Sequence, residues 1–428
     1  MKLLIKNGYI VDPKSNREGR YDIIAEDGVI TRVLEGGVDE VLDTFDKEID
    51  AEGLYVMPGF IDLHVHLREP GFEYKETIST GAAAAAHGGF TSICPMPNTK
   101  PATDSMEMIK YVIDKAKQEA VVHILPVGAV TKGQEGKELA DIIGMAKAGA
   151  VAISEDGKSV MDTAVYLEGM KLAKEAGIPV LAHCEDKTLV GKGVINAGLK
   201  DKEFGVPGIS NAVEDVIVAR DIIMAKEAGC RLHLCHCSTE DSVKLVKLAK
   251  EDGLDVTAEV CPHHFTLTDA DIKTDDAKYK MNPPLRKQSD VDMLKYGLYN
   301  GIMDVISTDH APHGEEEKSK GFANSPFGIV GLETAFPLSY TTLVLNGELT
   351  LSQLVEKMSV NPAAVLGIKK GCIDEGYAAD IVIADIDNEY TIDINTFASK
   401  GRNTPYDGWK VKGNIKYTLV DGNVVYEG

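Results

Sequence analysis

Basic residues are in short supply in this chain. Its 428 residues include 45 lysines and arginines against 67 aspartates and glutamates, so the formal net charge is -22. A protein that binds a phosphate backbone normally displays a basic face, and this balance therefore argues against a nucleic-acid partner. The negative charge is more simply a means of keeping the protein in solution.

Long hydrophobic runs are lacking at the start of the chain. Only Leu3, Leu4 and Ile5 lie between Lys2 and Lys6, and a run of this length is too short for a secretory signal or a membrane span. We therefore expect a cytoplasmic protein with no membrane partner.

Cysteine is scarce as well. Seven cysteines are scattered along the sequence, an odd number that fits reduced thiols better than a disulfide framework. Low-complexity segments are missing, and 44% of the residues are hydrophobic, so the chain can bury a large core. Its length suits a barrel of about 250 residues plus an accessory domain and argues against a small binding module.

The two ends of the chain carry β-strand signals. Short β-branched runs and Asp-Gly turns occur in both ends, and helical periodicity is missing from both. We predict that the ends pair into one small β-sandwich domain of residues 1–54 and 369–428. The strands expected in it are 3–10, 21–25, 29–34, 380–384, 415–420 and 424–426.

Strand and helix signals alternate through the middle of the chain. Eightfold alternation predicts an α/β fold with a (β/α)8 TIM barrel, here over residues 55–368, whose active site lies at the C-terminal ends of the strands. The strands are expected at 56–63, 90–94, 121–127, 150–154, 178–182, 231–235, 255–259 and 302–307. The helices are expected at 75–87, 105–119, 164–176, 213–228, 239–251 and 289–299.

Potential metal ligands follow five of these strand ends. His64 and His66 end the first strand, and because they are two residues apart both imidazoles should point the same way. Each candidate alone is explained as well by an ordinary buried or surface residue, but their joint placement predicts a two-metal cage. The candidates on later strands are Asp156, His183, His236 and Asp309.

Side chains alternate between the two faces of a strand, so residues an even number apart share a face. This rule, called strand parity below, separates expected ligands from their neighbours. His236 shares a face with Leu234, so we expect His233, Cys235 and Cys237 to point towards the helices. The two cysteines are then packing residues rather than thiolate ligands.

The same parity favours Asp156 over Glu155 and Asp309 over His310. Three residues after the seventh strand are harder to place, and we expect them to be structural or to support the ligands from outside the cage. They are Cys261, His263 and His264.

Seven short segments carry a family resemblance. They are 62–71 (DLHVHLREPG), 96–101 (MPNTKP), 154–157 (SEDG), 183–185 (HCE), 236–239 (HCST), 282–286 (NPPLR) and 307–313 (STDHAPH). In this order, over nearly the whole chain, they resemble the motifs of dihydroorotases of the long bacterial, class I type, in the amidohydrolase superfamily.

The resemblance implies a zinc cofactor with two ions per subunit. Related cyclic amide hydrolases usually bridge their metals with a carboxylated lysine, so an aspartate in this place marks the dihydroorotase branch. Lys158 lies nearby, but the SEDG pattern favours Asp156 as the bridge, together with a hydroxide. The ligands implied are His64, His66 and Asp309 for one ion and His183 and His236 for the other.

The resemblance also implies the reaction. Dihydroorotases reversibly cyclise N-carbamoyl-L-aspartate to L-dihydroorotate and water in de novo pyrimidine (UMP) biosynthesis. A metal-bound hydroxide would attack the cyclic amide, and Asp309 would carry the proton to the leaving nitrogen. The residues implied in substrate binding are Arg68, Asn98 and His313 for the carboxylate, and Asn282 with the backbone of Phe327 and Gly328 for the ring.

The expected charge of the metal centre favours an anionic substrate. Two divalent ions bring four positive charges, and Asp156, Asp309 and a hydroxide remove three, so the bare centre keeps about one positive charge. Arg68 adds a planar fork that suits a carboxylate. The ordinary alternative for Arg68 is a surface ion pair.

Two other functions stay open at this stage. One is a hydantoinase or allantoinase type of cyclic amide hydrolase, and the other is an inactive homologue that serves as a partner of aspartate transcarbamoylase. All six ligand positions are filled, which argues against inactivity. We expect a homodimer, and we expect the charged segment 314–325 to be either a mobile cover over the pocket or a solvated loop.

Overall fold

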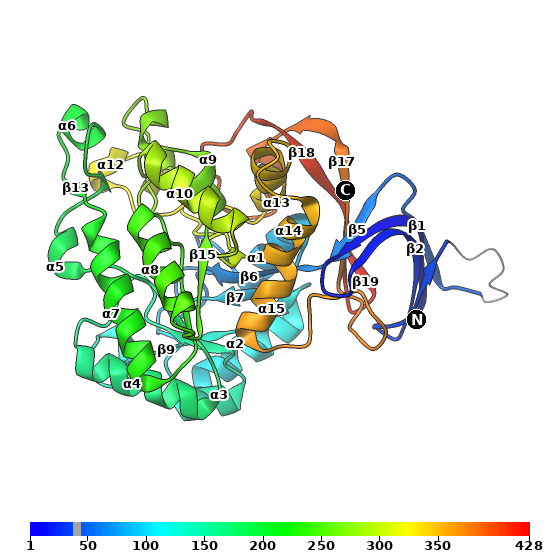
Figure 1. The fold of residues 1–428 in the computed structure, drawn as a ribbon, viewed down its shortest axis with the longest axis horizontal. Coiled ribbons are helices and arrows are strands. Elements are labelled where there is room, and N and C mark those ends of the chain that lie inside the picture. The colour runs from blue at the N-terminus through cyan, green and yellow to red at the C-terminus, as the bar shows by residue number, and fades with distance from the viewer. Residues whose placement is uncertain (37–43) are drawn as a thin grey trace.

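The computed structural model describes residues 1–36 and 44–428. A barrel surrounded by helices forms one part of the molecule, and a sheet that carries both termini lies against its side (Figure 1). This arrangement confirms the predicted α/β fold with a (β/α)8 barrel and a small β domain built from the two ends of the chain.

Both ends of the chain contribute to one mixed sheet. Within the described residues it has eight strands, in the order β19-β18-β17-β5-β1-β2-β3, with β4 paired to β1. The first half of β1 pairs with β4 and its second half with β5, in parallel in both cases. The strands are β1 (Lys2–Asp12), β2 (Arg17–Glu26), β3 (Val29–Glu35), β4 (Lys47–Asp50), β5 (Tyr55–Pro58), β17 (Ile381–Thr391), β18 (Lys410–Val420) and β19 (Asn423–Glu427).

The exact division into domains at 54/55 and 368/369 stays a prediction. The first predicted segment, 1–54, also includes residues 37–43, which lie outside the described residues.

The barrel strands run parallel around a closed ring. The ring consists of two parallel sheets, β6-β7-β8 and β9-β10-β11-β14-β15-β16. At one junction β8 and β9 are successive parts of one strand position. At the other junction a β-bridge joins Val65 to His310. Eight strand positions result among the described residues. Their bounds are β6 (Phe60–Val65), β7 (Phe90–Pro95), β8 (His123–Ile124), β9 (Val127–Ala129), β10 (Ala152–Ser154), β11 (Val180–Ala182), β14 (Leu232–Leu234), β15 (Val256–Val260) and β16 (Val305–Ile306).

One predicted strand is wrong in its extent. The apolar run 56–63 is two strands in two different sheets, because the chain leaves β5 and enters β6 at Gly59. A Cβ atom on Gly59 would lie 2.3 Å from the side chain of Thr91, so only glycine fits at this crossing.

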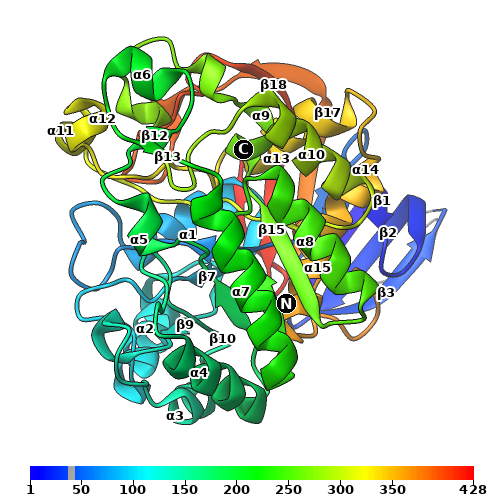
Figure 2. The ribbon, with the colours of Figure 1, turned by 60° about the vertical axis from the view of Figure 1, so that its left-hand side comes forward.

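Helices surround the barrel (Figure 2), and six of them lie where the periodicity predicted them, whereas those at 142–148 and 361–366 were not predicted. Side chains of Ser105, Asp162 and Thr239 cap three of them at the N-terminus, and Gly177 and Gly229 end two of them at positive φ. The helices that cover the strands are α1 (Ile78–His87), α2 (Met106–Glu119), α3 (Ile142–Ala148), α4 (Thr163–Ala176), α7 (Ala212–Ala228), α8 (Glu240–Glu251), α10 (Gln288–Tyr299) and α15 (Asn361–Leu366). No helix in the described ranges is long and apolar enough to cross a membrane.

The inside of the barrel is packed with side chains rather than open. Ile61, Leu63, Val127, Leu181 and Val305 are among the fully buried residues of one cluster there. This packing closes the lower part of the barrel, so polar groups at the strand ends above it face a cavity with a solid floor.

Candidate active site

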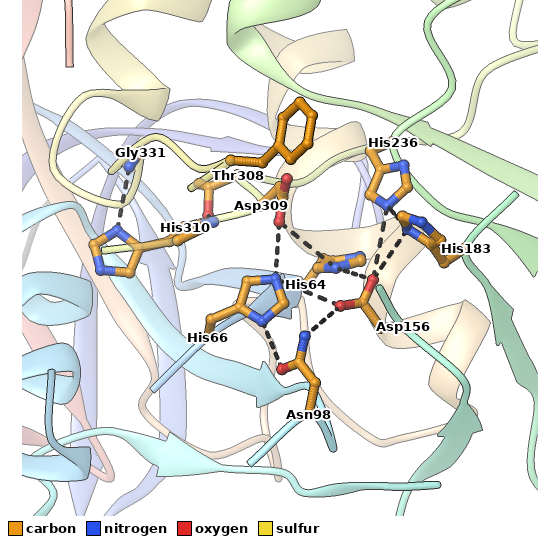
Figure 3. A network of polar contacts seen from close by, with 12 residues as sticks. His64, His66, Asn98, Asp156, His183, His236, Thr308, Asp309, His310 and Gly331 are labelled. Carbon is orange, nitrogen blue, oxygen red and sulfur yellow. Dashed lines mark hydrogen bonds and ion pairs between the residues drawn. The ribbon is translucent and has the colours of Figure 1, made fainter. Parts of the chain in front are cut away.

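The first predicted ligand group meets at the C-terminal end of the barrel (Figure 3). The Nε2 atom of His66 lies 3.0 Å from Oδ1 of Asp309, and Nε2 of His64 lies 3.7 Å from the same oxygen. These side chains come from strands at the two edges that close the ring, and all of them are buried.

The second group lies beside the first and shares Asp156 with it. Nδ1 of His183 lies 2.9 Å from Nε2 of His236 and 3.3 Å from Oδ1 of Asp156. The same oxygen lies 3.1 Å from Nε2 of His64, so the Asp156 carboxylate stands between the two groups (Figure 3).

The donor atoms fit a metal centre. Nε2 of His64 and Nε2 of His183 are buried, and within residues 1–36 and 44–428 neither has a hydrogen-bond partner. Buried imidazole nitrogens normally find a partner, and nitrogen and carboxylate oxygen are the ligands that zinc and related ions bind. Groups of His64 with Asp156 and His236, and of His64 with His66 and Asp309, are close enough to hold an ion.

The two carboxylates are ionised. Burial alone would raise the pKa of Asp309, but His66 and the other imidazoles hold it at about 2. Burial acts in the same way on Asp156, and there the neighbouring histidines hold the pKa well below its usual range. The cage therefore offers two negative charges to a cation.

Strand parity gave the wrong orientation for the sixth strand. Leu232 and Leu234 belong to the helix-facing core, whereas Cys235 packs inside the barrel and His233 contacts Glu259 of the next strand. His236 nevertheless faces the cage, because its backbone has a positive φ of 34° that turns the chain at this point. Parity could not predict this turn.

Strand parity gave the correct orientation at the ends of the fourth and eighth strands, where it favoured Asp156 and Asp309. Glu155 turns away from the cage and accepts hydrogen bonds from the backbone of Val130 and Thr131. His310 also turns away, and its Nδ1 accepts from the backbone of Gly331 at 3.2 Å (Figure 3). Lys158 is exposed, and its Nζ lies 3.4 Å from the carbonyl of Gly133 rather than in the cage.

A cavity of about 180 Å³ opens above the cage. Its lining includes every residue that the sequence predicted for ligation or substrate binding except His64, which is buried beneath it, and His313, which stands behind Arg68. Gly157 and Ala311 complete the lining. The structure thus brings the separate motifs to one concave site.

Arg68 lines this cavity without a carboxylate partner. Its Nε donates to the carbonyl of Pro312 at 3.3 Å, and no carboxylate of residues 1–36 or 44–428 lies within ion-pair distance of its guanidinium. The alternative of a surface ion pair is therefore wrong for Arg68. A cationic fork that faces a cavity is suited to an anionic ligand.

His313 is held as a neutral ring. Burial, Arg68 and Lys75 lower its pKa to about 2. Lys75 donates to Nδ1 at 3.1 Å, and Nε2 lies 2.8 Å from the carbonyl of Phe327 and 3.2 Å from Nη2 of Arg68.

Two amide side chains join the site to its surroundings. Asn98 bonds to His66 and to Asp156, each at 2.9 Å, and Asn282 donates to Glu185. Asn98 therefore touches the ligands directly, which the sequence did not predict.

Sequence reasoning also missed Glu259 and Lys75. Glu259 lies on β15 below the cage, with its carboxylate near His64, and Lys75 contacts His313. A buried carboxylate in an apolar strand was a usable signal for Glu259, whereas nothing in the sequence singled out Lys75.

The histidines after the seventh strand are fully buried beside the cage. Nε2 of His264 donates to the carbonyl of Pro283 at 2.9 Å, and burial lowers the pKa values of both His263 and His264. They are neutral side chains, which fits the expected structural role.

The segment 314–325 folds into two short helices, α11 (Glu315–Lys318) and α12 (Gly321–Asn324). Lys318 is buried, and its Nζ donates to the carbonyls of Lys280, Pro326 and Gly328 at 3.0, 3.1 and 2.9 Å. The segment is therefore anchored beside the cavity rather than a plain solvated loop.

Comparisons with known proteins agree with this site. A dihydro-orotase-like family model matches residues 53–242, and an amidohydrolase family model matches residues 324–426. The dihydroorotase of Acetivibrio thermocellus is 48% identical over 99% of this chain and 98% of its own length. That of Caldanaerobacter subterraneus subsp. tengcongensis is 46% identical over 100% of this chain and 98% of its own.

Solved structures share the whole fold. L-hydantoinase (dihydropyrimidinase) from Arthrobacter aurescens has a TM-score of 0.89 and 28% identity, covering 99% of this chain and 96% of its own. D-hydantoinase (dihydropyrimidinase) from Thermus sp. has a TM-score of 0.85 and 29% identity, covering 99% of this chain and 95% of its own. With curated relatives at 46–48% identity over nearly the full length, the chain belongs to the dihydroorotase family of the amidohydrolase superfamily.

Proposed function

We propose that this protein interconverts N-carbamoyl-L-aspartate and L-dihydroorotate, with water released on ring closure, in de novo pyrimidine synthesis. One observation carries the proposal: six side chains able to bind a metal, from five strand ends, surround a cavity that also holds Arg68, which has no carboxylate partner among the described residues. The chain's place in the dihydroorotase family supports the same reaction.

We propose two zinc ions per subunit. His64, His66 and Asp309 would hold one, His183 and His236 the other, and Asp156 would bridge them with a hydroxide. When bound, zinc lowers the pKa of a water molecule from about 15.7 to about 7 and polarises the amide carbonyl. The Nε2 atoms of His64 and His183, which make no hydrogen bond within the described residues, support this assignment.

Asp309 is the proposed proton carrier. Its carboxylate is ionised at neutral pH and lines the cavity, so it is able to accept a proton during attack on the ring. It then returns that proton to the ring nitrogen, which would otherwise leave as a poor amide anion. In the direction of ring closure the same proton moves the opposite way.

Arg68 binds the substrate carboxylate in this proposal. Its guanidinium faces the cavity, and the neutral His313 ring beside it adds no competing positive charge. Asn98 holds the metal ligands and lies within reach of the same end of the substrate. Asn282, Phe327 and Gly328 line the wall where the ring would lie.

We further propose a cytoplasmic homodimer. Exposed apolar side chains on the neighbouring outer helices α7, α8 and α10 support such a contact, namely Ile223, Leu248 and Tyr299 (Figure 2). Association with an aspartate transcarbamoylase is a separate proposal, to be tested by co-purification. The barrel domain is proposed to span 55–368, and the composite β domain 1–54 and 369–428.

A hydantoinase is the second candidate, favoured by the solved structures that share the fold. The bridge position argues against it, because Asp156 fills that position and Lys158 points to solvent. Arg68 also argues against it, because a hydantoin carries no carboxylate.

An assay of the purified, zinc-loaded protein decides between them. We expect turnover of dihydroorotate and of N-carbamoyl-aspartate, two zinc ions per chain by metal analysis, and negligible hydrolysis of hydantoin. Hydrolysis of hydantoin or allantoin without turnover of dihydroorotate would overturn the proposal.

A further inference from the structure

We propose that Glu259 is a positioning residue that fixes two metal ligands at once, the side chain of His64 and the backbone of His236. This inference rests on the proposed metal centre. Glu259 lies on β15 inside the barrel and is completely buried. It belongs to none of the predicted ligand positions.

The first contact is with the His64 ring. Oε1 of Glu259 lies 3.3 Å from Nδ1 of His64, within ion-pair distance, although the N–H is not aligned for a hydrogen bond. Nε2 of the same ring lies 3.1 Å from Asp156, so a carboxylate faces each nitrogen. When a metal takes Nε2, the one remaining ring proton is on Nδ1, beside Glu259.

The second contact is with the backbone of the sixth strand. The N–H of His236 donates to the same oxygen of Glu259 at 3.2 Å. His236 has a φ of 34°, a strained conformation for a residue other than glycine, which persists only where neighbours hold it. This hydrogen bond holds the turn that directs the imidazole into the cage.

The other oxygen of Glu259 is held by a residue outside the cage. Oε2 lies 3.0 Å from Nε2 of His233, whose Nδ1 contacts Thr257 at 2.8 Å. The carboxylate is thereby oriented from below, with Oε1 directed at the ligands. The buried carboxylate of Glu259 on β15 thus connects β14 to His64 on β6.

A separate metal ion in this place is a weaker explanation. His64, Cys235 and Glu259 are close enough to form a ligand group. Burial raises the pKa of Cys235 to about 12, however, so its thiol stays protonated at neutral pH and is a poor ligand.

The test compares Glu259→Gln with two controls. His233→Asn removes the third partner of Glu259 without touching a ligand. Asp290→Asn removes another buried carboxylate, which accepts from Asn211 and from the backbone of Glu240 far from the cage. Zinc affinity is measured by competition with a chelator. We expect about a 10–100-fold loss for Glu259→Gln and a clearly smaller loss for either control.

A second measurement keeps the inference independent of folding and of activity. Nitrogen-15 NMR of histidine-labelled, zinc-loaded wild-type protein reports which nitrogen of His64 carries the proton. We expect Nδ1. A proton on Nε2, unchanged zinc affinity in Glu259→Gln, or an equal loss in His233→Asn would each overturn the role of Glu259. Failure of the proposed reaction alone would leave these two readouts intact.

Discussion

The ring of His66 is tied to Asn98. Nδ1 of His66 lies 2.9 Å from Oδ1 of Asn98, while the amide nitrogen of Asn98 donates to Asp156 at 2.9 Å (Figure 3). Because the amide nitrogen donates to a carboxylate, its oxygen must accept from His66, which places the ring proton on Nδ1 and the lone pair on Nε2. Asn98 therefore fixes a ligand of one proposed ion and the bridge between both.

Asn98→Ala is expected to weaken zinc binding, and not only substrate binding. Loss of the amide frees the His66 ring and leaves one oxygen of Asp156 without its donor, so we expect about a 10–100-fold loss in zinc affinity and in kcat. Asn346→Ala, at an exposed asparagine whose side chain donates to the backbone of Thr342, is the matched control. A rise in KM with normal zinc content would show that Asn98 acts on substrate alone.

Asp309→Asn is expected to abolish most turnover with the fold intact. The amide keeps the shape of the side chain but cannot carry a proton, and general acid–base catalysis of this kind contributes about 10²–10⁴-fold in rate. The variant is assayed after zinc loading, with metal content and thermal unfolding measured on the same sample. Near-normal kcat would remove Asp309 from its proposed role.

Arg68→Lys is expected to impair substrates that carry a carboxylate. Lysine keeps the charge but not the planar fork, and a lost hydrogen bond to a charged group costs about 1.5–3 kcal/mol. This corresponds to about a 10–100-fold lower kcat/KM. Arg402→Lys is the control, since Arg402 also donates to backbone carbonyls but lies outside the cavity. Equal effects of both substitutions would make Arg68 a structural residue.

Most of the fold was predictable because its signals are local and periodic. Apolar runs marked the barrel strands, and caps such as Ser105 and Thr239 marked where helices begin. The exception at Gly59 has a different cause. One apolar run serves two sheets there, and only the close approach of Thr91, distant in sequence, shows where the chain changes sheet.

The proposed ligands were predictable as residue types at strand ends, and strand parity gave the orientation of Asp156 and Asp309 but not that of His236. His236 has a positive φ, and such a residue can reverse the alternation on which parity depends. Glu259 was missed for a related reason. Its role comes from contacts with His64 and His236 on two other strands, and sequence patterns describe one strand at a time.

Lys318 gives a pH dependence that stability measurements can detect. Lys318 is 7% exposed, and its ammonium group donates to three backbone carbonyls. Burial and the nearby charge of Lys280 lower its pKa from 10.5 to about 7. Between about pH 7 and about pH 10 the unfolded chain therefore holds a proton that the native protein has lost, and the free energy of unfolding rises with pH by up to about 1.4 kcal/mol per unit.

Lys318→Met is expected to remove this rise. Urea unfolding at about pH 7 and about pH 9 should show the wild type gaining about 2–3 kcal/mol relative to Lys318→Met between the two pH values. Lys320→Met, at an exposed lysine of the same segment, should follow the wild type. Parallel pH profiles for wild type and Lys318→Met would show that the native amine keeps its ordinary pKa. A neutral amine has two hydrogens for three carbonyls, so the same titration must loosen the hold of segment 314–325 on Lys280, Pro326 or Gly328.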